Sequence, residues 1–236
     1  MSQQKTYTQK QWQHTQYASY FGYITQAIVN NFAPLLFLIF QDVYEIPLEQ
    51  ITLLVTVNFC FQLITDVVAA RFVDKIGYRP CIVAAHLFAA AGLVGLGVFP
   101  RILPSPFWGL LCAVLLYAVG GGLIEVLVSP IVEACPTDNK ASVMSLLHSF
   151  YCWGSVGVIL VSTLFLQVFG KGSWTILAVF WALLPLCNAL AFSKVPIARL
   201  TEEGEGLPMR KLFSSKLFWI LAVLMFASGA SELSMS

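Results

Sequence analysis

Long apolar runs separated by short polar segments dominate the chain. Seven runs stand out, at 18–40, 48–70, 80–99, 106–131, 143–168, 173–193 and 214–236. A helix needs about 20 apolar residues to cross the hydrocarbon core of a bilayer. Because that core holds no water to satisfy backbone groups, each run is predicted to be a helix. The pattern therefore predicts an all-α membrane protein with seven spans.

The composition supports a chain embedded in lipid. Hydrophobic residues make up 58% of the 236 residues and charged residues 11%, and the mean hydropathy is +0.79. Soluble domains carry about 25% charged residues. The net charge of +1 is uninformative, because acids and bases are sorted by side rather than in excess. No nucleic-acid partner is expected. Residues 1–17 are polar and no small-residue cleavage site follows the first run, so an uncleaved signal anchor is expected.

Basic residues predict the orientation. If the N-terminus is inside, the external segments hold two bases, Arg101 and Lys171. The internal segments then hold eleven: Lys5, Lys10, Arg71, Lys75, Arg79, Lys140, Lys194, Arg199, Arg210, Lys211 and Lys216. Cytoplasmic loops carry the excess of Lys and Arg. A multi-pass protein of the cell membrane with a cytoplasmic N-terminus is predicted.

The turn between the second and third runs, residues 70–79, reads Ala-Arg-Phe-Val-Asp-Lys-Ile-Gly-Tyr-Arg. Asp74, Lys75, Gly77 and Arg79 fall at the spacing of the loop signature of the major facilitator superfamily, which this turn resembles. Ala70 stands where that signature has Gly, and Arg71 follows it. We expect a cytoplasmic gate in which Asp74 caps or pairs near a helix end, with Arg71 and Arg79 as the candidate partners for a pair. The alternative is a generic hairpin kept inside by its positive charges.

The resemblance implies a fold and a domain organisation. Residues 1–17 would form a cytoplasmic segment and residues 18–193 a six-helix N-terminal bundle of two inverted three-helix repeats. A central cytoplasmic loop would follow at 194–213, and residues 214–236 would be the first helix of a second half. Two such halves enclose a substrate site near the bilayer midplane. We therefore expect an N-terminal part of a protein of about twelve spans, with the missing C-terminal half as its partner.

Ionisable residues within spans are costly and usually line a cavity or a proton path. They are Asp66, His86, Glu125, His148 and Glu232. Glu125 follows glycines 120–122, which permit close helix approach, and precedes Pro130 by five residues. A partly desolvated carboxyl favours its neutral form and can exchange a proton. Glu125 is the leading proton-coupling candidate; the alternative is a structural carboxyl hydrogen-bonded to neighbouring helices.

A narrower resemblance points to the fucose permease-type sugar–proton symporters. Their helix 4 carries a glutamate five residues before a proline, as Glu125 does. Residues 147–154, which include His148, are similar to their helix 5, and Asn30 and Asn31 resemble their Asn pair. An aspartate three positions after that pair is replaced here by Pro34. The first span therefore lacks the coupling carboxylate, and Glu125 would act alone or with His148.

The second span carries a polar stripe. Asn58, Gln62 and Asp66 follow one another at intervals of four residues, which places them on one helical face. Such a stripe must face protein or water. It is either a cavity wall with Asp66 as a second proton or cation site, or a network at the cytoplasmic gate that includes His86.

The substrate site is predicted from amides, carboxyls and one aromatic ring. Sugars are commonly bound by aromatic faces together with amide and carboxyl groups, which suits a sugar or polyol. The predicted set is Asn30, Asn31, Gln62, Glu125, His148 and Trp153. The alternative for Trp153 is an interface anchor.

Enzymatic signatures are missing from the sequence. The six cysteines have no Cys-x-x-Cys pair or metal-ligand spacing. There is no His-Glu-x-x-His, Gly-x-Ser-x-Gly or nucleotide-binding loop. Neither an enzyme nor a metal or other cofactor is expected.

Three functions remain open. The leading one is a secondary active transporter for proton-coupled uptake of a sugar or similar small polar metabolite. A drug or metabolite efflux antiporter is the second, weakened because the fifth span has Gly154 and Gly157 but no proline. A non-transporting membrane fragment or scaffold is the third.

Overall fold

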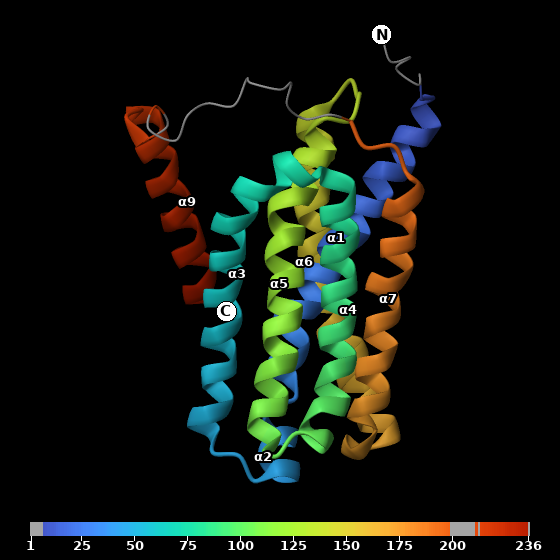
Figure 1. Ribbon diagram of the computed structural model, residues 1–236, viewed down its shortest axis with the longest axis vertical. Coiled ribbons are helices and arrows are strands. Elements are labelled where there is room, and N and C mark those ends of the chain that lie inside the picture. The colour runs from blue at the N-terminus through green and yellow to red at the C-terminus, as the bar shows by residue number, and fades with distance from the viewer. Residues whose placement is uncertain (1–6, 199–210, 212, 236) are drawn as a thin grey trace. The chain divides into compact units, whose positions relative to one another are not determined.

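The computed structural model describes residues 7–198, 211 and 213–235, in two units divided at residue 200. The first unit is a bundle of helices (Figure 1). Its elements are α1 (Gln9–Leu35), α2 (Phe37–Tyr44), α3 (Leu48–Ile76), α4 (Tyr78–Ile102), α5 (Pro106–Glu133), α6 (Lys140–Phe169), the short 3₁₀ helix η1 (Lys171–Ser173) and α7 (Trp174–Lys194).

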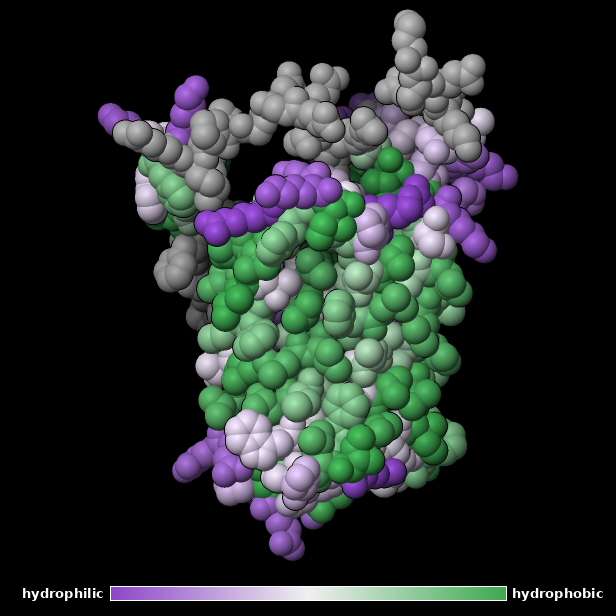
Figure 2. Space-filling model, viewed as in Figure 1, coloured by the Kyte–Doolittle hydropathy of each residue, from purple (hydrophilic) through white to green (hydrophobic). Residues whose placement is uncertain are grey.

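Five of these segments are long and apolar enough to cross a membrane: α3, α4, α5, α6 and Lys171–Lys194. The pair α1 and α2 makes a sixth if the two helices count as one span with a 45° bend. Figure 2 shows a band of hydrophobic side chains on the first unit with hydrophilic residues at both of its ends. The predicted all-α membrane bundle is confirmed.

The first span differs from the prediction at both ends. The helix was expected over 18–40, but α1 begins at Gln9, inside the polar segment, where Thr8 and Gln11 form a capping box. The helix then breaks at Leu36, two residues after Pro34. Proline has no N–H for the helical ladder, and its ring clashes with the carbonyl four residues earlier. This explains why α2 leaves at an angle.

Close contact between α4 and α5 forms the centre of the bundle. A side-chain carbon at Gly92 would lie 2.5 Å from the main-chain nitrogen of Tyr117, and one at Gly120 would lie 2.6 Å from the carbonyl oxygen of Ala85. Small residues let helix backbones approach in this way. In the most apolar 18-residue window of each helix, the buried share of the window is 56% in both α4 and α5. It is 28% in α3 and only 17% in α6. The helices α3 and α6 therefore carry wide exposed apolar faces.

The turn between α3 and α4 is a single residue, Gly77, with φ at 99°. Only glycine adopts this conformation without strain. The Arg79 side chain donates from Nη1 to the carbonyl oxygens of Phe192 and Ser193, at 3.0 and 2.8 Å, at the end of α7. Asp74 instead accepts from the Tyr78 hydroxyl at 3.4 Å. Arg79 therefore caps α7, where a cation is favourable, and the ion pairs among the described residues do not join Asp74 to either Arg71 or Arg79. The gate role of this turn stays a prediction.

The second unit contains α9 (Lys216–Met235), which lies within the run predicted at 214–236. Glu232 is on this helix, but its side chain lies outside the described part of the chain. Most of the predicted central loop at 194–213 also lies outside the described residues. The domain boundaries there stay predictions.

Candidate functional site

Polar side chains from α1, α3 and α5 meet inside the bundle at Gln26. The Gln26 side chain is 3% exposed. Its Nε2 donates to Oε1 of Gln62 on α3 and to Oε2 of Glu125 on α5, each at 3.3 Å. Gln26 therefore joins two residues that the sequence had singled out, although it was not itself predicted.

Gln62 is the hub of the contacts. Its Nε2 donates to Oδ1 of Asn30 at 2.8 Å and to Oδ1 of Asn58 at 3.1 Å. Asn58 and Gln62 are both buried, so this face of α3 points inward as the spacing predicted. Asn30 in turn donates to the hydroxyl of Tyr151 on α6 at 3.3 Å. We call the four amides Gln26, Asn30, Asn58 and Gln62 the amide network.

The glycine run on α5 makes room for this network. A side-chain carbon at Gly121 would lie 3.1 Å from both Gln26 Oε1 and Gln62 Nε2, and one at Gly122 would lie 2.8 Å from the main-chain oxygen of Gln62. Gly120 contacts α4 instead. Successive helical residues point about 100° apart. Three consecutive glycines therefore admit neighbours on three sides, one turn before Glu125.

Glu125 lies at the edge of the network, with its side chain exposed at the surface of the unit. His148 on α6 is also exposed, and its ring centroid lies 5.4 Å from that of Tyr23. Tyr23 shares a hydrogen bond of 2.7 Å with Ser129, one turn after Glu125. Among the described hydrogen bonds, Glu125 accepts from Gln26. A direct Glu125–His148 bond is not seen among them.

Asp66 lies one turn after Gln62 on α3 and is half-buried. Of the two alternatives for the polar stripe, the network that includes His86 is not formed among the described hydrogen bonds. His86 is fully buried, and its Nδ1 lies 2.8 Å from the Ile82 carbonyl oxygen. Its Nε2 lies 2.8 Å from Nδ2 of Asn188 on α7. His86 therefore belongs to a separate network between α1, α4 and α7.

The structure places the remaining predicted residues on α1 and α6. Asn31 donates to the Ala27 carbonyl at 2.8 Å and to the Ser155 hydroxyl at 3.2 Å, which joins the two helices. Trp153 is 76% exposed. It is two residues from both Tyr151 and Ser155, so it lies on the other side of α6. The structure does not bring Trp153 to the amide network. The Tyr151 hydroxyl instead accepts a hydrogen bond from Asn30 of that network.

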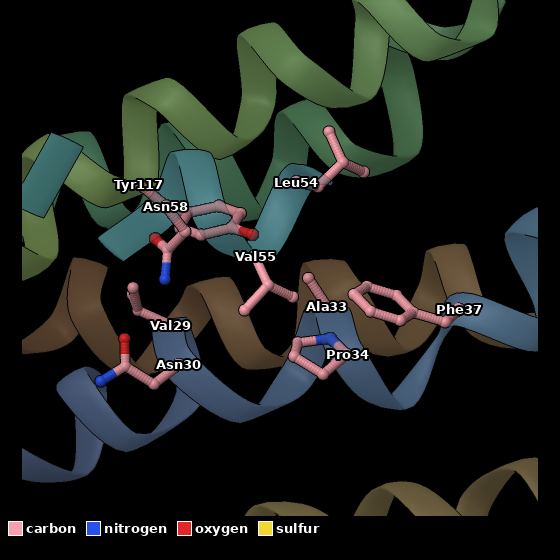
Figure 3. A pocket seen from close by; sticks show the side chains of 9 residues that line it. All are labelled: Val29, Asn30, Ala33, Pro34, Phe37, Leu54, Val55, Asn58 and Tyr117. Atoms are coloured by element: carbon pink, nitrogen blue, oxygen red, sulfur yellow. The ribbon is translucent and has the colours of Figure 1, made fainter. Parts of the chain in front are cut away.

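A small pocket of about 10 Å³ borders the network at the bend after α1, which is room for about one water molecule. Figure 3 shows Asn30 and Asn58 at one end of the pocket and Phe37 at the other. The lining residues are Val29, Asn30, Ala33, Pro34, Phe37, Leu54, Val55, Asn58 and Tyr117. The Pro34 bend thus lies beside the polar residues of α1 and α3.

A family model for the Major Facilitator Superfamily matches residues 19–236. The chain belongs to this superfamily. The first-unit bundle, the turn at residues 70–79 and the family match agree with one another. No curated protein sequence matches the chain.

Solved structures of a peptide transporter share the fold. A crystal structure of the peptide transporter POT in complex with sulfate is similar to this chain, with a TM-score of 0.61 and 16% sequence identity. A mutant of that transporter is similar with a TM-score of 0.62 and 16% sequence identity. In each case the match covers 94% of this chain and 45% of the transporter. The chain thus spans less than half the length of these transporters, and identity this low shows the fold alone.

Proposed function

We propose that the chain is the N-terminal half of a secondary active transporter that takes up a sugar or similar small polar metabolite together with protons. The observation that supports this is the amide network, which gathers four amides and the Glu125 carboxylate between three helices. Amides both donate and accept hydrogen bonds, as substrate hydroxyl groups do. A transporter rather than an enzyme is the function that this site and the superfamily favour.

Glu125 is the proposed coupling group because its hydrogen bond connects it to the amides. The ionised carboxylate accepts from Gln26, which also donates to Gln62. A protonated carboxyl can donate instead, so the protonation state of Glu125 would change how Gln26 and Gln62 are held. A proton shifts a conformational equilibrium only through its differential affinity for the two states. His148 and Asp66 are the further candidates for this proton path.

The substitution Glu125→Gln in the intact transporter tests this proposal. In proteoliposomes, it should retain counterflow exchange of radiolabelled hexoses, fucose among them. Accumulation driven by a pH gradient should fall at least tenfold, because Gln imitates a permanently protonated carboxyl. Glu133→Gln on the same helix is the matched control, since Glu133 forms a surface ion pair with Lys140, and such pairs contribute little. Unchanged accumulation by Glu125→Gln would show that this carboxyl is structural.

The proposed location is the cell membrane with a cytoplasmic N-terminus. In the first unit, six described bases lie at the end where α1 begins: Lys10, Arg71, Lys75, Arg79, Lys140 and Lys194. Two lie at the other end, Arg101 and Lys171. An impermeant thiol reagent should label Glu45→Cys from outside intact cells, and Lys75→Cys only after lysis. Labelling of Lys75→Cys in intact cells would reverse this topology.

The exposed apolar faces of α3 and α6 fit the same proposal. The buried share of the most apolar window is smaller in these two helices than in α4, α5 and the segment Lys171–Lys194 that contains α7. A second six-helix half would pack against such faces, and the lipid bilayer would cover the rest. This half is the proposed protein partner of the chain.

A further inference from the structure

Two hydrogen bonds join α1 to α5 about one helical turn apart. Gln26 donates to Oε2 of Glu125 at 3.3 Å, and the hydroxyl groups of Tyr23 and Ser129 share a bond of 2.7 Å. Residue numbers rise from 23 to 26 along α1 while those of the partners on α5 fall from 129 to 125, so the two helices are antiparallel. The Tyr23–Ser129 bond therefore lies next to the Glu125 contact, on the side where α1 begins.

A glycine lets this second bond form. A side-chain carbon at Gly22 would lie 3.1 Å from Cγ2 of Val128, so α1 approaches α5 closely beside the bond. Tyr23 is only 7% exposed. A buried tyrosine hydroxyl needs a hydrogen-bond partner, and Ser129 is that partner. The Tyr23 ring is thus anchored to α5 at its hydroxyl end.

The same ring lies against α6. Its centroid is 5.4 Å from that of His148, with the ring planes at 50°, and 6.4 Å from that of Tyr151, with the planes at 76°. Aromatic rings attract one another at centroid separations of about 4.5–7 Å. None of the described hydrogen bonds includes His148, so the ring contact is the described interaction that orients it. One tyrosine of α1 therefore connects a side chain of α5 to the exposed histidine of α6.

Titratable groups of three helices lie along this junction. They are Tyr20 and Tyr23 on α1, Glu125 on α5, and His148, Tyr151 and Cys152 on α6. Glu125 lies within electrostatic range of the Tyr23 hydroxyl, and Asp66 on α3 lies within that range of Glu125. Nearer the helix ends, Glu133 on α5 and Lys140 on α6 pair with each other. The Tyr23 side chain thus lies between the α5 and α6 members of the proposed proton path.

We propose that Tyr23 is a positioning residue of this path. Its hydroxyl holds Ser129 one turn from Glu125, and its ring holds His148, so that Glu125 and His148 act as a unit without a direct bond. This inference rests on the proton coupling proposed at Glu125. The two contacts can be separated, because Tyr23→Phe keeps the ring and loses the bond to Ser129, whereas Tyr23→Leu loses both.

The pH dependence of hexose uptake by the intact transporter in proteoliposomes tests this role. Uptake of radiolabelled hexoses is measured between about pH 5 and pH 8, where histidine titrates. Tyr23→Leu and His148→Gln should each shift the midpoint of the pH profile by at least about half a unit in the same direction. The double variant should shift it no further. Tyr23→Phe should lie between Tyr23→Leu and wild type, because its ring still orients His148.

Tyr20→Leu is the matched control. Tyr20 is also a buried tyrosine of α1, and its ring stacks 4.7 Å from that of Phe150 on α6, which cannot titrate. This variant should lose thermal stability as Tyr23→Leu does, because each loses a buried ring contact between the same two helices. It should keep the pH midpoint of wild type. Size-exclusion profiles establish that each variant is folded.

The positioning role is overturned by a folded Tyr23→Leu variant with the pH midpoint of wild type. An equal shift in Tyr20→Leu would also overturn it, since the cause would then be lost packing. If Tyr23→Leu does not fold, Tyr23→Phe and Ser129→Ala decide: equal shifts that do not add support the role, and no shift in either contradicts it.

Failure of the proton-coupling proposal gives a different result. Glu125→Gln would then keep its pH-driven accumulation, whatever the Tyr23 variants do. If Glu125→Gln loses accumulation while Tyr23→Leu keeps the wild-type pH profile, the positioning role alone is wrong. Wild-type uptake that does not depend on pH would overturn both proposals.

Discussion

The helix α1 takes part in two buried polar networks that differ in how fully their atoms are satisfied. In the network with α4 and α7, His86 is bonded at both ring nitrogens, and Nδ2 of Asn188 donates to the Ala18 carbonyl at 3.0 Å as well. His86 is completely buried and Asn188 is 5% exposed. In the amide network with α3 and α5, Gln26 keeps an unpartnered oxygen, and the contacts lead to the exposed Glu125.

This difference is the basis on which we propose one network as structural and the other as substrate-binding. Polar groups that only hold helices together are satisfied by each other, because an unmade hydrogen bond inside a protein is costly. Spare acceptors next to a surface carboxylate are useful when a ligand supplies the missing donors or charge. The His86–Asn188 network should therefore carry stability, and the amide network should carry binding.

The largest effect is expected from His86→Ala. The substitution removes a fully buried ring and leaves the Asn188 amide without one of its partners. Such changes cost about 3 kcal/mol of unfolding free energy, so the melting temperature should fall by several degrees or more. Thermal unfolding followed by size exclusion measures it, with His14→Ala as the control, because His14 is exposed on α1. A His86→Ala protein that melts like wild type would contradict the structural role.

A smaller effect is expected from Gly122→Ala. The added carbon would lie 2.8 Å from the main-chain oxygen of Gln62, and a backbone atom cannot move aside cheaply. Overpacking of this kind costs about 1–3 kcal/mol, and it should also displace α3 from α5 and reduce hexose counterflow. Gly157→Ala on α6 is the matched control, because a side-chain carbon there meets no atom within 4 Å. Equal stability and counterflow in the two variants would show that α3 and α5 need no close contact.

The helices and part of the site could be predicted because each depended on a local pattern. The apolar runs gave the positions of the spans, and the four-residue spacing of Asn58 and Gln62 gave their common face. Gln26 lies four residues before Asn30 on α1, so the same spacing could have marked it. Its hydrogen bonds to Gln62 and Glu125 could not be foreseen before α3 and α5 were placed beside it. In α6, apolar residues occur all round the helix, and the sequence could not tell the Tyr151 side from the Trp153 side.

Long-range partners were also beyond prediction. The bond between His86 and Asn188 joins residues 102 positions apart, and the capping of α7 by Arg79 spans 113 and 114 positions. Neither charge nor periodicity relates such positions. Only the order in which antiparallel helices pack decides which of them meet.

Hexose binding by Gln62→Met tests most directly whether the amide network binds substrate. Gln62 makes three hydrogen bonds to the other amides, and Met keeps its length and helical propensity. We predict a dissociation constant at least tenfold weaker for the hexose that the wild type binds, which is about 1.4 kcal/mol, and a melting temperature close to that of wild type. Binding equal to wild type in the folded variant would contradict a substrate site at the amide network.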